Sequence, residues 1–385
     1  MTDKPSIYFV ATEFGEVHHG PAVYTRALWD LFHDSTEFDF HLVTLSSDLV
    51  HPRIHTPPKE NGKRRGFYHR MATHILNSVP RDRPNVLLHV NSAHLISSNI
   101  AAQYRTVVQI NDTEVCQHKI SLARIKQYGL RRMIALQWRR RREQTVAKNS
   151  EMVVGNSDFT TQTVRDRYNL PESDVTRIYK AVPITQFLNV NPEPPDPKHL
   201  RLVFIGSHWE RKGLRVLIEA VGILKQNDSL ETVRLDVYGC PAEAESSHFR
   251  QFAVAKDVET QVRFCGVLQR ADAPKTLANA SMLVLSSFEE ALGLVTIEAI
   301  ATGIPVVGSH VGGIPEVINH PHLGQLVPPG NPQTLASAII SQHRDDTSEQ
   351  KIRFRKDSSR RFDTDTLKLN VAAFYGQLFS NPSTD

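Results

Sequence analysis

The chain has 385 residues, of which 40% are hydrophobic and 22% charged, with a formal net charge of +4. This is the composition of a globular protein, and the length argues against one ordinary core and for two domains of roughly 150–200 residues each. The mild positive charge is compatible with anionic ligands or an anionic surface and is diagnostic of neither.

The first half of the sequence alternates strand-like and helix-like segments. The earliest apolar run, Ile7–Val10, is followed by a Gly/His loop at 13–21 and by a helical pattern from Val23 to Phe32. Further buried strands are predicted at Phe40–Leu45, Val86–Val90, Thr106–Ile110 and Met152–Val154. Alternating strands and helices of this kind indicate a parallel sheet with helices on both faces.

A proline-rich segment interrupts this pattern. Residues 191–197 contain four prolines, which neither a helix nor a central strand tolerates. We therefore expect a domain at 1–190, a linker at 191–199 and a second domain at 200–360.

The strand and helix pattern then restarts. Strands are predicted at Leu202–Gly206, Leu235–Gly239, Val262–Gly266, Met282–Leu285 and Pro305–Gly308, with a helix at Leu214–Lys225 and helical spacing again in the tail at 361–385. Two doubly wound domains joined in this way leave a cleft between the carboxyl ends of their strands, where ligands of open α/β sheets bind.

The most informative stretch carries two carboxylates eight positions apart. Glu290 precedes a helix that is apolar almost all round, and Glu298 lies inside it. A carboxylate on a buried helix needs a partner, and a polar ligand is a natural candidate. The first-turn N–H groups around Leu292, Gly293 and Leu294 make an anion site next to Glu298. A nucleoside diphosphate fits this layout, while a capping role for Glu290 and a buried salt bridge for Glu298 stay open.

The first strand-to-helix turn of the second domain contains Ser207, Arg211 and Lys212. Lys212 can reach a diphosphate as a point charge, and a solvated loop lysine is the open alternative.

In the first domain, Gly20 precedes the helix at the first strand-to-helix turn. Asn111 follows the strand that ends at Ile110, at the same cleft-facing edge of the predicted sheet. Gly20 lets an acceptor or phosphate approach closely, and Asn111 is a candidate catalytic residue, while ordinary turn or capping chemistry is equally compatible with both residues.

Arginines at 131, 132 and 139–142 surround Trp138 on a predicted helix. This helix either docks on an anionic membrane surface or acidic acceptor, or is simply a solvated face.

No metal-binding motif occurs, so we expect no metal and no cofactor. The longest apolar runs are too short for a signal peptide or a spanning helix, and Cys116, Cys240 and Cys265 form no CxxC pair. We therefore expect free thiols and a cytoplasmic protein, with peripheral contact at the inner membrane face as an alternative.

These motifs resemble the retaining glycosyltransferases of the GT-B fold, in the group 1 and family 4-like class. The resemblance is carried by the E-x7-E pattern of Glu290 and Glu298, by Gly303-x-Pro305-Val306-Val307 and by Phe204-Ile205-Gly206 with Lys212-Gly213. Segments 312–318 and 324–330 extend it. It covers most of the chain, and the first half matches more loosely.

The resemblance implies two Rossmann-like domains, a final helix that crosses back to the first domain, and a nucleotide sugar held by the second. It implies that Glu290 binds hydroxyls of the donor sugar, Glu298 the ribose, and Lys212 the diphosphate. It further implies transfer with retention and without a metal to a hydroxyl acceptor: a glycan, a lipid-linked glycan or a small molecule. We expect uridine as the base, polysaccharide or lipopolysaccharide biosynthesis as the setting, and no nucleic acid partner.

Two positions depart from the family pattern. Ser207 stands where many relatives have an arginine, for which Arg211 is the candidate substitute, and Asn111 stands where many have a histidine. Ser207 and Asn111 motivate one alternative, a catalytically impaired sugar-nucleotide-binding protein. A nucleotide-sugar epimerase on the same fold is a further alternative.

Overall fold

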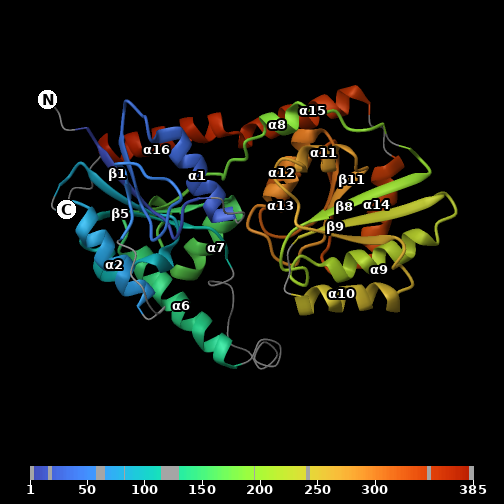
Figure 1. Ribbon diagram of the computed structural model, residues 1–385, viewed down its shortest axis with the longest axis horizontal. Helices are drawn as coiled ribbons and strands as arrows, with labels where there is room; N and C mark the ends of the chain where they lie inside the picture. Colours follow the sequence, from blue (N-terminus) through green and yellow to red (C-terminus); the bar gives the residue numbers. More distant parts are fainter. Residues whose placement is uncertain are drawn as a thin grey trace. The chain divides into compact units, whose positions relative to one another are not determined.

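The computed structural model describes residues 4–15, 20–57, 66–81, 83–113, 130–194, 196–239, 243–344 and 348–380. The chain forms two units (Figure 1): the first joins the residues up to Ala181 with those from Thr364 onwards, and the second is Val182–Asp363. The chain therefore passes into the second unit once and returns once.

The described residues of the first unit form a seven-stranded sheet in the order β3-β2-β1-β4-β5-β6-β7, with every pairing parallel. All five predicted strands of this half are present. The additional strands β3 and β7 are short and lie at the two edges, where no buried apolar run marks them. The strands are β1 (Ser6–Val10), β2 (Asp39–Val43), β3 (Ile54–His55), β4 (Val86–Val90), β5 (Arg105–Ile110), β6 (Met152–Gly155) and β7 (Val175–Arg177).

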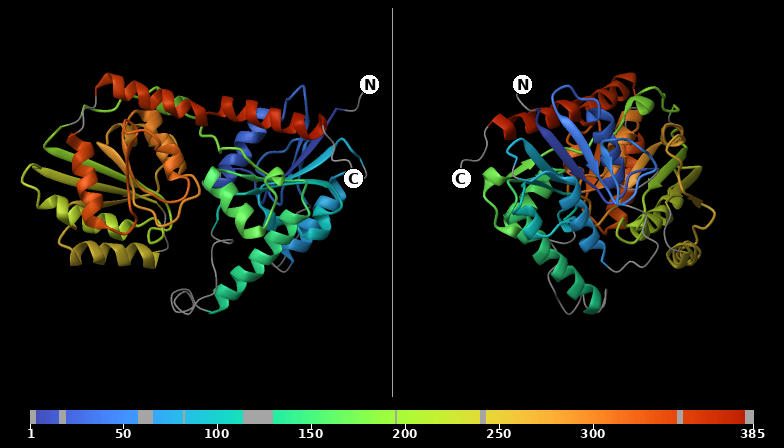
Figure 2. Two further views of the ribbon diagram at one scale, coloured as in Figure 1. Left: turned by 180° about the vertical axis from the view of Figure 1, so that it is seen from behind. Right: turned by 60° about the vertical axis from the view of Figure 1, so that its left-hand side comes forward.

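Helices cover both faces of this sheet. One apolar cluster joins the sheet to α1 and α16, which lie side by side (Figure 2), and another joins it to α2, α3, α6 and α7. The helices are α1 (Gly20–Phe32), α2 (Phe67–Ser78), η1 (Ala93–Leu95), α3 (Ser98–Ala101), α6 (Leu130–Lys148), α7 (Asp158–Tyr168), η2 (Glu172–Asp174) and α16 (Thr364–Ser380).

The last helix, α16, is part of the first unit, as the resemblance implies. The hydroxyl of Tyr375 lies 2.7 Å from Nδ1 of the buried His89 on β4, and Arg105 donates to the carbonyl of Leu378 at 2.6 Å. Leu367 and Val371 are buried against the same sheet. The helix therefore completes the core of a unit whose other elements lie nearly two hundred positions earlier in the chain.

The second unit contains a six-stranded parallel sheet in the order β10-β9-β8-β11-β12-β13 within the described residues. All five predicted strands are present, and the edge strand β13 is additional. The strands are β8 (His199–Ile205), β9 (Thr232–Tyr238), β10 (Val262–Gly266), β11 (Met282–Leu285), β12 (Val306–Ser309) and β13 (Gly324–Val327).

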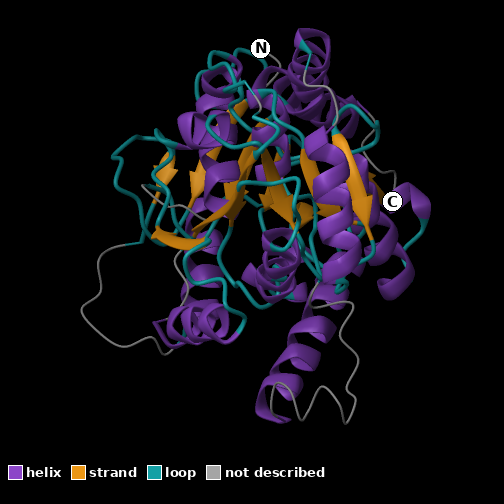
Figure 3. Ribbon diagram, turned by 90° about the vertical axis from the view of Figure 1, so that its right-hand side faces the viewer, coloured by secondary structure: helices purple, strands orange, loops and turns teal. Residues whose placement is uncertain are grey.

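Helices of the second unit also pack on both faces (Figure 3), with α9 and α14 in contact and α12 packed against α8, α11 and α15. They are α8 (Thr185–Leu188), α9 (Leu214–Lys225), α10 (Glu243–Ala255), α11 (Ala273–Ala278), α12 (Leu294–Thr302), α13 (Ile314–Val317), α14 (Pro332–Arg344), α15 (Glu349–Ser359) and η3 (Arg360–Phe362).

The proline-rich segment that we expected to link the domains packs on the second unit. The backbone N–H of Glu193 donates to the carbonyl of Ala278 at 2.8 Å, and the Glu193 carboxylate pairs with Arg201 on β8. The passage between the units lies earlier, after Ala181. Prolines exclude regular structure in this segment, but they do not stop it from bonding to the helix α11 and the strand β8 beside it.

Candidate active site

The strand order of the second unit reverses between β8 and β11. From β8 the chain winds outward through β9 and β10, then returns to β11 and winds outward through β12 and β13. A reversal of this kind opens a crevice at the carboxyl ends of the two central strands, where ligands of open α/β sheets bind. The loops that follow β8 and β11 carry Lys212 and Glu290, respectively.

Close backbone packing holds these two loops together. Gly213, at the N-terminus of α9, has a φ of +71°, and a Cβ built on it would lie 1.9 Å from the carbonyl oxygen of Ser286 in the other loop. The Ser286 hydroxyl donates to the Gly213 carbonyl at 2.9 Å. Only glycine permits both this backbone conformation and this approach.

The loop after β11 is held on its other side by a glycine pair. The N–H of Gly313 donates to the carbonyl of Glu290 at 3.3 Å, and a Cβ on Gly312 would overlap that same oxygen. With both sides fixed, the Nζ of Lys212 forms an ion pair with Oε2 of Glu290. Their side chains are only 14% and 12% exposed, so the pair is largely withdrawn from water.

The N-terminus of α12 lies directly beside this pair. Gly293 precedes the helix with a φ of +84°, and a Cβ on it would lie 3.4 Å from Cγ of Glu290. Within the described part of the chain, the backbone N–H groups of Leu292, Gly293 and Leu294 have no backbone acceptor. A helix N-terminus with free N–H groups favours an anion, and here a lysine stands next to it.

Glu298 lies one turn beyond Leu294, and its side chain is buried inside the unit. Its Oε1 accepts a charged hydrogen bond from Nη1 of Arg270, in the loop between β10 and α11. Burial raises the pKa of the Glu298 carboxyl, while the charge and hydrogen bond of Arg270 oppose that rise. The buried salt bridge that the sequence left open is therefore present, and Arg270 is the partner of Glu298.

Arg270 is a site residue that the sequence analysis missed. Its guanidinium carbon lies 5.4 Å from the ring centre of Phe187 on α8, and its side chain is 40% exposed. Its Nη2 is buried and has no hydrogen-bond partner among the described residues. The arginine and Glu298 together thus offer an unused donor close to a carboxylate acceptor.

Ser207 and Arg211 lie in the same loop as Lys212, and both are exposed. The Nη1 of Arg211 donates to the carbonyl of Glu289 at 3.1 Å, which places its guanidinium beside the loop that carries Glu290. The neighbouring Trp209 is buried, and its indole N–H donates to the Gly206 carbonyl at 2.9 Å. That indole bond anchors the loop, while Ser207 contributes no charge to it.

Asn111 and Gly20 belong to the first unit. Asn111 follows β5, and its amide nitrogen donates to the backbone carbonyl of Asn91, which follows β4. The backbone carbonyl of Asn111 accepts from Asn156 after β6 at 2.9 Å. Its Oδ1 is buried without a partner in the described residues. Gly20 is the first residue of α1, and the preceding His18-His19 pair lies outside the described residues.

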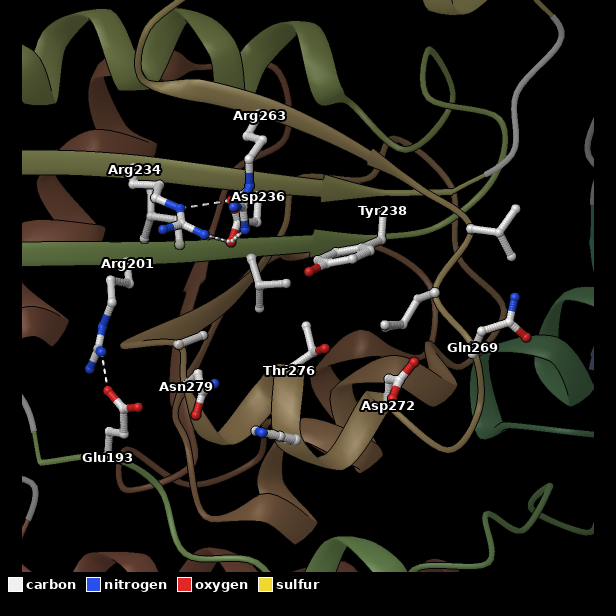
Figure 4. A pocket seen from close by; sticks show the side chains of 16 residues that line it. Glu193, Arg201, Arg234, Asp236, Tyr238, Arg263, Gln269, Asp272, Thr276 and Asn279 are labelled. Atoms are coloured by element: carbon white, nitrogen blue, oxygen red, sulfur yellow. Dashed lines mark hydrogen bonds and ion pairs between the residues drawn. The ribbon is translucent and has the colours of Figure 1, made fainter.

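A cavity of about 500 Å³ opens beside the loop that carries Arg270 (Figure 4). Most of its charged groups are paired. The guanidinium nitrogens of Arg234 and Arg263 both donate hydrogen bonds to the carboxylate oxygens of Asp236 at 2.8–2.9 Å, and Arg201 forms an ion pair with Glu193. The ring of Tyr238 reaches over the interior from β9, opposite α11. Because two arginines share one aspartate, the group around Asp236 keeps a net positive charge.

No group of three or more His, Cys, Asp or Glu side chains that could hold a metal ion occurs in the described ranges. No helix in the described part of the chain is long and apolar enough to cross a membrane. Of the three cysteines, Cys265 is described and is a free, half-buried thiol, while Cys116 and Cys240 lie outside the described residues.

Two family models match the chain. The model of the Glycosyltransferase Family 4 matches residues 18–186, and that of the Glycosyl transferases group 1 matches residues 199–345. Among curated proteins, the chain is similar to the D-inositol 3-phosphate glycosyltransferase of Corynebacterium glutamicum, with 26% identity over 63% of this chain and 61% of that protein. The chain thus spans about three fifths of this relative, and 44% of a Corynebacterium efficiens relative of the same name, at 30% identity.

Solved structures resemble the chain over nearly its full length. A sucrose-phosphate synthase from Thermosynechococcus elongatus has a TM-score of 0.73 at 17% identity and covers 98% of this chain and 100% of its own. Anabaena HepE in complex with UDP has a TM-score of 0.69 at 17% identity and covers 97% and 100%. Two parallel-sheet Rossmann-like units in one chain define the GT-B fold. The chain belongs to the GT-B glycosyltransferases, with a Family 4 domain in its first half and a group 1 domain in its second.

Proposed function

We propose that this chain is a retaining glycosyltransferase that moves a sugar from a nucleotide diphosphate sugar to a hydroxyl group of an acceptor. The observation that carries the proposal is the Lys212–Glu290 pair beside the N-terminus of α12. It combines a cation, free backbone N–H groups and a carboxylate within a few residues of the point where the strand order reverses. A diphosphate and a hydroxyl-rich sugar are the ligand groups that match these three.

Lys212 and the α12 terminus act on the leaving group in this proposal. When the bond between the anomeric carbon and the diphosphate oxygen breaks, the diphosphate takes the electron pair and gains negative charge. A lysine ammonium has three N–H donors, so it can hold Glu290 and a phosphate oxygen together. Donors already in place where charge develops lower the barrier, and this commonly contributes two to three orders of magnitude in rate.

Glu290 and Glu298 bind opposite ends of the donor in this proposal. Glu290 accepts hydrogen bonds from hydroxyls of the transferred sugar, and Glu298, with one oxygen on Arg270, accepts from the ribose through the other. We propose uridine as the base, a proposal that the UDP and UDP-glucose complexes of HepE support. A thermal-shift panel of uridine, guanosine and adenosine diphosphates tests the base, because a ligand that binds only the folded state raises its stability.

The acceptor in this proposal is a hydroxyl of a glycan, a lipid-linked glycan or a small molecule, in polysaccharide or lipopolysaccharide biosynthesis. The names of the relatives support this range: one acts in amylovoran biosynthesis, and a fold neighbour, WaaG, is involved in lipopolysaccharide biosynthesis. We further propose that transfer needs no metal or cofactor, with Lys212 and the helix N-terminus supplying the positive charge. Transfer in the presence of EDTA should then equal transfer without it.

Two substitutions test the site. We expect Lys212→Ala and Glu290→Ala each to lower the transfer rate by about a hundredfold or more, with the circular dichroism spectrum unchanged. The matched controls are Lys198→Ala and Glu231→Ala, which break an exposed ion pair of the same unit and should leave the rate unchanged. Full activity in both Lys212→Ala and Glu290→Ala would reject the assignment.

A catalytically impaired sugar-nucleotide-binding protein is the second candidate. It is favoured by Asn111, whose amide nitrogen is already engaged by Asn91, and by the uncharged, exposed Ser207. Incubation with nucleotide sugars, in the presence and in the absence of mixed glycan acceptors, separates these candidates. Slow hydrolysis or transfer favours the transferase, binding without turnover favours the binding protein, and an isomerised donor formed without acceptor identifies an epimerase.

A further inference from the structure

The helix α6 of the first unit carries apolar side chains on two opposite faces. Met133, Val146 and Ala147 are buried against the unit. Leu130, Ile134 and Trp138 point outward instead, with 54%, 56% and 54% of their surfaces exposed. The N-terminal half of the helix extends past the other described elements of its unit (Figures 1 and 2). An outward apolar face on such a helix has no role in the core of the unit.

The three exposed residues form one stripe, because side chains four positions apart stack along the same side of a helix. Other large apolar side chains that are exposed, such as Val254 on α10 and Leu369 on α16, occur singly on their helices. Single exposed apolar residues are normal on soluble proteins, whereas a contiguous set marks an interaction surface.

Cationic side chains flank this stripe. Arg131, Arg141 and Lys148 are exposed on the same side of the helix, and the guanidinium carbon of Arg142 lies 5.4 Å from the ring centre of Trp138. The only acidic residue of α6 is Glu143, which is buried and accepts a hydrogen bond from Tyr168 at 2.6 Å. The outward face of α6 therefore combines apolar side chains with positive charge and has no carboxylate of its own.

We propose that this face of α6 docks on an anionic lipid bilayer, with Leu130, Ile134 and Trp138 inserted at the interface and Arg131, Arg141 and Lys148 on the headgroups. Tryptophan and branched aliphatic side chains partition into the interfacial region, and basic side chains bind anionic headgroups while their stems cover apolar surface. A second copy of this face would oppose arginines to arginines, so charge disfavours self-association.

Vesicle flotation tests the proposal with the full chain. We expect the protein to float with phosphatidylcholine vesicles that contain phosphatidylglycerol, and not with phosphatidylcholine alone, at low ionic strength. Arg131→Gln with Arg141→Gln should weaken the partition by roughly thirty-fold, as expected for two basic residues at an anionic surface. Ile134→Ser with Trp138→Ser should abolish flotation. Raising the salt should weaken it for the wild type, because screening shortens the range of the attraction.

Tryptophan fluorescence reports the inserted side chain directly. The chain has three tryptophans, and Trp29 and Trp209 are buried, so a blue shift on vesicle binding comes from Trp138 and should vanish in Trp138→Phe. The matched controls are Leu369→Ser on α16 and Arg353→Gln on α15, which change exposed residues of the same kinds. Both variants should bind anionic vesicles like the wild type.

Three outcomes would overturn the proposal. The first is no flotation with anionic vesicles at low salt, and the second is equal flotation of the Ile134→Ser, Trp138→Ser double variant. The third is a dimer in sedimentation that this variant dissociates, which would assign the face to a second copy. None of these results depends on whether the chain transfers a sugar.

Discussion

Glu298 shows how far a single residue can be interpreted from its sequence context. The apolar helix around it predicts burial, and burial predicts a partner, which the structure confirms. The partner itself was not predictable, because Arg270 lies 28 positions earlier in a loop that has no distinguishing pattern. Which of several loop arginines meets a buried carboxylate depends on the packing of β10, α11 and α12, and no local signal carries that information.

Removing Arg270 should make the stability of the protein more dependent on pH. The pKa of Glu298 is raised in the folded chain, so the folded protein binds this proton more tightly than the unfolded chain does. The stability that this proton binding contributes is lost as the pH rises through the folded pKa. Without Arg270 the buried charge is unpaired. We expect Arg270→Ala to lower the free energy of unfolding by about 2 kcal/mol at pH 8, less than for a fully buried pair because the arginine is partly exposed.

Urea unfolding at pH 8 and pH 5 measures this effect. The loss should shrink at pH 5, where the carboxyl of the variant is more fully protonated. Glu298→Gln combined with Arg270→Ala should remove most of the pH dependence that the single variant adds. A loss of equal size at both pH values would mean that Arg270 stabilises the unit through packing, including its contact with Phe187, and not through the charge of Glu298.

At the scale of elements, the loops after β8 and β11 depend on Gly213. We compare Gly213→Ala with Gly266→Ala, because the two glycines have nearly the same positive φ, +71° and +76°. A Cβ on Gly266 meets nothing within 4 Å, so that variant should cost about 1–2 kcal/mol of backbone strain alone. A Cβ on Gly213 meets a backbone oxygen at 1.9 Å, so the loops must separate.

We expect Gly213→Ala to lose about 2 kcal/mol more than Gly266→Ala, in line with overpacking costs, and to weaken nucleotide binding as well. Chemical unfolding gives the first quantity, and titration with UDP gives the second. Equal stability and equal binding in the two variants would show that the contact between the loops is not needed to hold Lys212 beside Glu290.

The central strands were predictable because both faces of a parallel sheet are buried, so each strand is an unbroken apolar run. The helix α9 was predicted with its observed bounds, Leu214–Lys225. Of the edge strands in the described residues, β10 was predicted, whereas β3, β7 and β13 were missed because their side chains are only partly buried and form no unbroken apolar run. For the site, the sequence identified the loops that carry Lys212 and Glu290, while their direct ion pair and the engagement of Glu298 by Arg270 required the tertiary structure.

At the scale of the whole molecule, the first unit depends on the end of the chain. Deleting residues 364–385 would remove α16, expose the apolar cluster that it covers and leave the buried His89 without Tyr375. We expect the first unit of this truncated chain to unfold at a clearly lower temperature while the second unit keeps its own transition. Calorimetry and limited proteolysis measure both.

The control for the truncation is Leu369→Ser, a change on the exposed side of α16, where 72% of the leucine surface is accessible. It should leave both transitions in place. A truncated chain whose first unit melts as late as that of the full chain would show that α16 adds nothing to its core.

The separation of the first unit into two distant stretches of chain has a consequence for biosynthesis. The residues of the second unit are continuous, so they can fold as soon as they leave the ribosome, whereas the first unit has to wait for its last helix. Throughout that interval a nascent chain would display an uncovered apolar sheet face, which chaperones recognise and which favours aggregation. A premature stop shortly before Thr364 should therefore lower the soluble yield of the product in the cell and increase its binding to chaperones, even though every residue of both sheets has been made.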